Sequence, residues 1–172
     1  MTIEMPTHVD EIKRLFAYHY WATHRLLKVV GGLTPEEYSR EVAGAYGSVR
    51  NTLVHTLSAE WGWLDRAGGW PRGDKLSADD YPTPASLIDQ WAKVEEKMNE
   101  FLAGISADLL DGVVEFKIGD KAFKQERGQL LRHAAIHSVH HRGQVALLIR
   151  ALGRAPGNFD LLFYSEEAGA EA

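Results

Sequence analysis

Four stretches of the chain place apolar residues at three- and four-residue steps, and this periodicity is the feature that most constrains the fold. Such spacing gives an amphipathic helix a single apolar face. The stretches expected to form long helices are residues 9–30, 48–68, 83–102 and about 126–152. Four long amphipathic helices with short or modest connections predict an all-α protein built as a four-helix bundle.

Capping residues and helix breakers predict shorter elements between the long helices. Gly31-Gly32 should end the first long helix, and Thr34-Pro35 has the cap and first-turn proline that begin a short extra helix. Before the last long helix, Val113–Ile118 and Lys121–Lys124 flank Gly119-Asp120. Two β-rich runs around a two-residue loop containing glycine are typical of a small β-hairpin.

Length and composition predict one domain over residues 1–172, with a frayed tail after about residue 165. A chain of 172 residues with 45% hydrophobic residues can bury a core without disulfides. The formal net charge is -5, and neither sign forms long runs, which argues against nucleic acid or an anionic membrane as the main partner. The apolar runs are too short to span a bilayer, and the first ten residues lack the pattern of a secretory signal. We therefore expect a cytoplasmic protein.

Cysteine is absent from the sequence, and this limits the chemistry the chain can perform. Disulfides, thiolate nucleophiles and Cys-ligated zinc are excluded. Any metal site must therefore be built from His, Asp and Glu.

Histidine is concentrated in the last long helix, where four of the eight histidines fall within nine residues: His133, His137, His140 and His141. At about 100° per residue, His133, His137 and His141 cover a sector of roughly 80° that also contains apolar residues, so they should point into the bundle. Two imidazoles four residues apart stand one helical turn above each other, a spacing that lets both bind one ion.

His55 is the best third ligand, because it lies in the middle of the second long helix among Leu53, Val54 and Leu57. Three neutral imidazoles leave one coordination position open, as in catalytic rather than structural metal sites. Zinc and nickel both suit imidazole ligands, and ligand identity does not choose between them. The alternative is that these are ordinary bundle histidines, bonded to neighbours or reaching the surface.

Other residues are weaker candidates. His133 is either a further ligand or a group that orients His137, and His19, on an apolar stripe, is a reserve ligand. Glu60 and Gln144 are candidates for hydrogen bonds that orient the ligand imidazoles, although a solvated Glu60 is nearly as plausible. Arg142 falls roughly opposite the ligand stripe, which favours a salt bridge or a dimer contact.

Three aromatic residues are open to two interpretations. Trp61, Trp63 and Tyr18 would line a substrate pocket beside the metal or, more commonly for aromatics at helical spacing, form core.

The sequence resembles the DinB/YfiT-like family of metal-dependent enzymes. The resemblance rests on His55 in its Leu-Val-His-Thr-Leu block, on His137-x3-His141-Arg142-Gly143-Gln144, and on the order of segments from about residue 8 to 165. It implies a four-helix bundle, often a homodimer, that holds nickel, zinc or a similar divalent ion on three histidines. Relatives include enzymes that transfer low-molecular-weight thiols and a thiol-dependent isomerase.

Three functions are therefore open. The first is a thiol-dependent transferase or isomerase acting on a small molecule, in which an external thiol supplies the nucleophile that this cysteine-free chain lacks. The second is a metal-dependent hydrolase, in which the same open position activates water. The third is a non-catalytic metal-binding stress protein.

Overall fold

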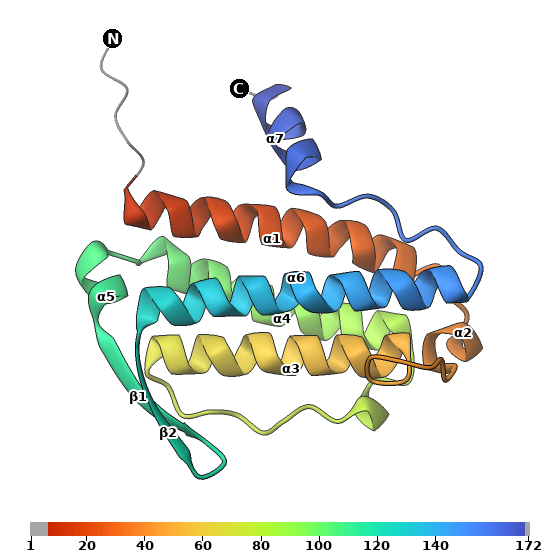
Figure 1. The fold of residues 1–172 in the computed structure, drawn as a ribbon, viewed down its shortest axis with the longest axis horizontal. Coiled ribbons are helices and arrows are strands. Elements are labelled where there is room, and N and C mark those ends of the chain that lie inside the picture. The colour runs from red at the N-terminus through yellow and green to blue at the C-terminus, as the bar shows by residue number, and fades with distance from the viewer. Residues whose placement is uncertain (1–6, 171–172) are drawn as a thin grey trace.

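The long helices pack side by side as a bundle in a computed structural model that describes residues 7–170 (Figure 1). The elements are α1 (His8–Val30), α2 (Pro35–Ser39), α3 (Val49–Gly68), the short 3-10 helix η1 (Ala78–Asp80), α4 (Pro84–Ala103), α5 (Ala107–Asp111), β1 (Val113–Ile118), β2 (Lys121–Glu126), α6 (Arg127–Ala151) and α7 (Leu161–Ala170). The predicted all-α bundle with a small hairpin before the last long helix is confirmed. Helix α6 lies between α1 and α3, and this position determines which of its side chains become buried.

The helix ends follow the local chemistry of the sequence. The hydroxyl of Thr34 accepts a hydrogen bond from the backbone N–H of Glu37, whose carboxylate accepts one from the N–H of Thr34, so α2 begins with a capping box. Ser48 caps α3 through the N–H of Asn51. Gly69 follows α3 with φ 71°, a left-handed conformation that glycine adopts without steric cost.

The core consists of two apolar clusters at opposite ends of the bundle. One includes Leu26, Leu53, Leu57, Trp91, Leu148 and Ile149. The other includes Ile12, Phe16, Leu64, Met98, Leu110 and Leu131. Along α3 and α6, the buried polar residues Glu60 and Arg142 fall between these two clusters. The middle of the bundle is therefore polar.

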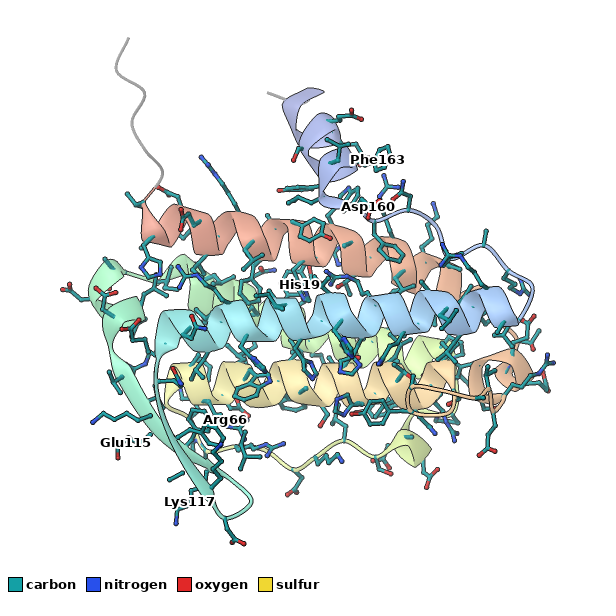
Figure 2. All side chains as sticks on the ribbon, viewed as in Figure 1. His19, Arg66, Glu115, Lys117, Asp160 and Phe163 are labelled. Atoms are coloured by element: carbon teal, nitrogen blue, oxygen red, sulfur yellow. The ribbon has the colours of Figure 1, made fainter. Side chains whose placement is uncertain are left out.

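The hairpin is held against one end of the bundle by a single face. Strands β1 and β2 are antiparallel, and the side chains of Phe116 and Phe123 stack as a cross-strand pair with ring centroids 5.4 Å apart. Gly119, in the two-residue loop, has φ 57°. The opposite face is exposed and carries Glu115 and Lys117 (Figure 2).

The predicted frayed tail is instead helical as far as Ala170, and residues 171–172 lie outside the described part of the chain. Helix α7 is tied to α1 because the Trp21 indole N–H donates to the carboxylate of Glu167, which also pairs with Arg25. These partners lie about 140 residues away in sequence, so local pattern gave no sign of them. Within residues 7–170, no helix has the length and apolar character needed to cross a bilayer.

Candidate metal centre

The structure brings His55 of α3 together with His137 and His141 of α6. One ring nitrogen of each lies within 4.8 Å of the other two. The ring centroid of His55 is 5.4 Å from that of His137 and 4.7 Å from that of His141. The two α6 histidines meet because they stand one turn apart, and His55 joins them because α3 packs along α6.

Gln144 fixes the tautomer of His141. The side-chain amide of Gln144 donates to Nε2 of His140 at 3.0 Å, so its carbonyl oxygen accepts from Nδ1–H of His141 at 2.7 Å. A neutral imidazole protonated at Nδ1 has its lone pair at Nε2. That nitrogen lies 3.1 Å from Nε2 of His137, so an unprotonated nitrogen faces the centre of the cluster.

Burial keeps the three imidazoles neutral. Desolvation, together with repulsion from the neighbouring His141, lowers the pKa of His55 to about 4. Desolvation also lowers the pKa of His137 to about 4, with added repulsion from His141 and His55. The pKa of His141 is lowered by burial, although its hydrogen bond to Gln144 opposes this. Neutral imidazole is the form that binds metal ions.

The donor set fits a divalent ion. Nitrogen atoms around one tetrahedral zinc ion lie about 3.4 Å apart, as follows from Zn–N bonds of about 2.1 Å, so the cluster needs only small movements to reach that geometry. His137 also has a buried Nδ1 without a hydrogen-bond partner, so the protein itself leaves this ring incompletely satisfied. Across the described residues, no Asp or Glu joins the three nitrogens as a further ligand. An ion held here would keep a position open to a small molecule.

Tyr46 stands beside the cluster and was missed by the sequence analysis. Its ring stacks on His55 with centroids 4.1 Å apart, and its hydroxyl is 3.0 Å from Nε2 of His55. The loop that carries it includes Gly44 and Gly47 at positive φ and Ala45 at φ 48°. A non-glycine residue in the left-handed region is uncommon and is enriched at functional sites. The two glycines flanking an aromatic residue were the only sign in the sequence.

His133 does not join the three histidines, and the prediction that it points into the bundle is wrong. Its side chain is exposed and packs edge-on against Trp63, with centroids 4.5 Å apart. The ring of His137 lies 5.8 Å away. The sector of roughly 80° was too wide for all three rings to face the same neighbour, because α3 covers only part of it.

His19 and Glu60 belong to a second, separate cluster. Nε2 of His19 lies 3.1 Å from the carboxylate of Glu60, which also accepts a hydrogen bond from the hydroxyl of Tyr20 at 2.9 Å. Arg142 donates to Nδ1 of His19 at 3.0 Å, so Nε2 must carry the proton that Glu60 accepts. Figure 2 shows His19 between α1 and α6.

This second cluster corrects three expectations from the sequence, those for Glu60, His19 and Arg142. Glu60 orients His19 and contacts none of the three metal-ligand candidates, and His19 has no free nitrogen to offer an ion. Arg142 is buried, and it interacts with a neutral imidazole rather than with an acid or a second copy. Helix α1 supplies the partners, and a helical wheel of α6 alone could not identify them.

The three aromatic candidates divide between different environments. Trp61 packs on the core, whereas Trp63 lies beside His133 near the candidate centre. Tyr18 is on α1, where its hydroxyl donates to the backbone carbonyl of Phe159 and Arg142 lies over its ring. Of these three aromatic residues, Trp63 is the one that packs against a histidine neighbouring the three candidate ligands.

The fold and the site define an α-helical bundle with three converging histidines that could hold a metal ion. The profile of the DinB family matches residues 5–172. The chain therefore belongs to the DinB family.

Individual relatives agree with this assignment. Protein DinB of Bacillus subtilis is 23% identical over 159 residues, covering 88% of this chain and 91% of the relative. The uncharacterized protein YrdA of the same organism is 24% identical, covering 84% of this chain and 83% of the relative. The crystal structure of a DinB-like protein from Bacillus cereus superposes with a TM-score of 0.71 at 21% identity, covering 86% of this chain and 94% of that one. At this identity the structural likeness concerns the fold.

Proposed function

We propose that the chain is a metal-dependent enzyme in which His55, His137 and His141 hold a divalent ion, zinc or nickel, and an external low-molecular-weight thiol is transferred to a small electrophilic substrate. The observation that carries the proposal is the convergence of three neutral imidazoles without a carboxylate or a fourth histidine among the described residues. Such a site supplies an open coordination position.

The chain contributes orientation rather than a nucleophile. Gln144 holds His141 with its lone pair toward the cluster, and Tyr46 covers one side of His55. A divalent ion bound here would act as a Lewis acid that favours thiolate over thiol at neutral pH. In the transfer, the thiol gives its proton to solvent, sulfur forms a bond to carbon of the electrophile, and the leaving group departs with its electron pair.

Soft sulfur ligands suit borderline ions such as zinc, which favours a thiol over water as the activated group. The absence of cysteine from the chain agrees with a thiol supplied from outside. A hydrolase would use the same histidines with water as nucleophile. The two functions therefore differ in the cosubstrate and not in the ligands.

The first test is metal content. Protein purified without an affinity tag should bind one divalent ion per chain, and His137→Ala should lose most of it, because the two remaining imidazoles cannot hold an ion as tightly. His24→Ala is the matched control, since His24 is exposed and pairs with Glu95 far from the cluster. Equal metal content in both variants would contradict the assignment.

The second test is turnover with a panel of thiols and electrophiles. The wild type should accelerate conjugation or thiol-dependent isomerisation, and His141→Ala should abolish this while the helical circular dichroism signal is retained. Hydrolysis of an ester or amide without any thiol, together with no thiol-dependent reaction, would replace the transferase with the hydrolase.

Association into a homodimer is proposed as well. The outward face of α6 carries Ile136, Val139 and Leu147, all exposed, in line with Gly143, where added side-chain atoms would meet open space. A second copy could cover this stripe. Sedimentation across a dilution series should show a dimer, and a monomer throughout would contradict it.

A further inference from the structure

An apolar pocket lies between the hairpin and the helices, next to the candidate metal centre. Its volume is about 370 Å³, and its walls include Trp63, Phe116, Phe123, Gln129, Leu130 and His133. Small-molecule sites commonly have volumes of about 300–1,000 Å³ and apolar, aromatic walls with a few polar groups. An empty apolar cavity of about 150 Å³ already accepts benzene, so this pocket has room for a substituted aromatic ring.

The hairpin forms one wall of the pocket, and the side chains of that wall remain partly exposed to solvent. Phe116 and Phe123 stack on each other on the face toward the helices, yet both are only half-buried. Ile118, on the same face, remains 47% exposed. Figure 2 shows Glu115 and Lys117 on the opposite face. Two cations pack on the aromatic walls themselves: the Arg66 guanidinium lies 5.3 Å from the ring centroid of Phe116, and the Lys121 ammonium lies 5.0 Å from that of Phe123. The inward face of the hairpin is largely apolar, with Lys121 at its tip and Gln125 at its base, and the protein itself does not cover it.

His133 connects the pocket to the three histidines. Its ring contacts Trp63 with centroids 4.5 Å apart, and His137 is the next ring along α6, 5.8 Å away. A molecule in the pocket therefore lies one helical turn from a candidate metal ligand.

We propose that this pocket binds the neutral aromatic ring of the electrophilic substrate and directs its reactive carbon toward the thiol held at the three histidines. The part of this proposal that concerns the thiol and the reactive carbon rests on the proposed function. No Asp, Glu, Lys or Arg is among the lining residues, and Arg66 and Lys121 lie over the rings of the aromatic walls. An ionised group among these apolar walls would lose hydration, which favours a neutral ring. Aromatic rings gain from edge and face contacts with Trp63, Phe116 and Phe123. The amide of Gln129 can bond a polar substituent at the edge.

The experiment uses a neutral fluorescent probe, N-phenyl-naphthylamine, with the metal-free protein. Phe123→Ala should weaken probe binding by about tenfold or more, because a large share of the aromatic wall is removed. Phe163→Ala is the matched control, since Phe163 is exposed on α7, away from the hairpin (Figure 2). Its binding should equal that of the wild type. Equal loss in both variants would overturn the assignment.

A second variant guards against disruption of the hairpin by Phe123→Ala. Gln129 is exposed on α6, so Gln129→Trp should fill the pocket from the helix side without altering either strand. Probe binding should be lost in this variant while its thermal unfolding stays unchanged. Full retention of binding would overturn the proposal.

His137→Ala separates the pocket from the proposed function. It should bind the probe as the wild type does, although it cannot hold the metal ion. Where turnover is present, Phe123→Ala should raise KM for an aryl electrophile and leave KM for a small alkyl electrophile unchanged; equal effects on both would refute the pocket's role in catalysis. If the wild-type protein binds the probe at the pocket but takes up no divalent ion, the proposed function alone is contradicted.

Discussion

Two histidine clusters lie close together in the middle of the bundle and differ in what faces their nitrogen atoms. In the buried cluster, His19 accepts from Arg142 at one nitrogen and donates to Glu60 at the other. In the cluster of His55, His137 and His141, Nε2 of His141 faces Nε2 of His137, and Nδ1 of His137 has no hydrogen-bond partner. The protein satisfies both ring nitrogens of His19, although Nη2 of Arg142 lacks a hydrogen-bond partner, whereas it leaves the ring of His137 incompletely satisfied.

Burial alone therefore does not distinguish a ligand-binding histidine from a structural one. His19 is only 1% exposed, less than His141 at 5%, yet its hydrogen bonds define a structural role. Glu60 compensates the charge of Arg142 through the neutral imidazole between them. This polar layer joins α1, α3 and α6 between the two apolar clusters of the core. The second cluster joins α3 and α6, and its inner ring nitrogens face one another and the hydroxyl of Tyr46 rather than a charged side chain.

The largest effect should follow from breaking the buried cluster. Glu60→Ala removes the acceptor of both His19 and Tyr20 and leaves Arg142 without a compensating charge, so the free energy of unfolding should fall by about 3–5 kcal/mol. Urea denaturation measures it. The control is Glu95→Ala, which removes the partner of the exposed His24 and should cost only about 0–1 kcal/mol. Similar losses of unfolding free energy in the two variants would show that the buried and the exposed His–Glu pairs stabilise the fold equally.

A smaller effect should follow from loosening the open cluster. Gln144→Ala removes the hydrogen bond that orients His141, so metal affinity should fall by about 10–100-fold while unfolding in the absence of metal changes little. Competition with a chelator measures the affinity. Gln129→Ala, on the same helix but without a bond to a candidate ligand, should keep wild-type affinity. Unchanged affinity in Gln144→Ala would mean that packing alone orients the ring.

The pH dependence of stability should also separate the clusters. The folded-state pKa values of His55 and His137 are near 4, below the ordinary value of 6.5, so between these limits the unfolded chain binds more protons than the folded one. The free energy of unfolding of the metal-free protein should therefore fall as pH falls from 6.5 toward 4. Replacing both residues by Gln should flatten this slope. A slope unchanged in that variant would assign the effect to other groups.

The smallest effect is expected at Tyr46. Tyr46→Phe keeps the ring stacked on His55 and removes one partly exposed hydroxyl, so metal-free stability should change by about 0.5–1.5 kcal/mol. Tyr46→Ala, which also removes the ring, should expose His55 further and raise its pKa toward the ordinary value, as NMR titration would show. If the pKa of His55 is the same in both variants, the stacked ring has no role in keeping His55 neutral.

Local sequence signals were enough to predict the helices, the hairpin and the His137–His141 half of the histidine cluster. Caps, prolines and glycines act on residues three or four positions away, so Thr34, Ser48 and Gly69 could be interpreted without the rest of the chain. The pairing of His137 with His141 is equally local, because a helical turn alone brings the rings together.

Contacts between distant helices select the partners of the buried polar residues. His19 and Glu60 are 41 positions apart, and His19 and Arg142 are 123 apart, so neither contact leaves a local pattern. A helical wheel shows which sector is apolar but not which neighbour covers it, and for that reason His133, Glu60 and Arg142 were placed wrongly. The aromatic pocket likewise exists only because the hairpin folds back on α3 and α6. Packing of distant helices, which periodicity does not encode, separates the histidines that stabilise the bundle from those available to a ligand.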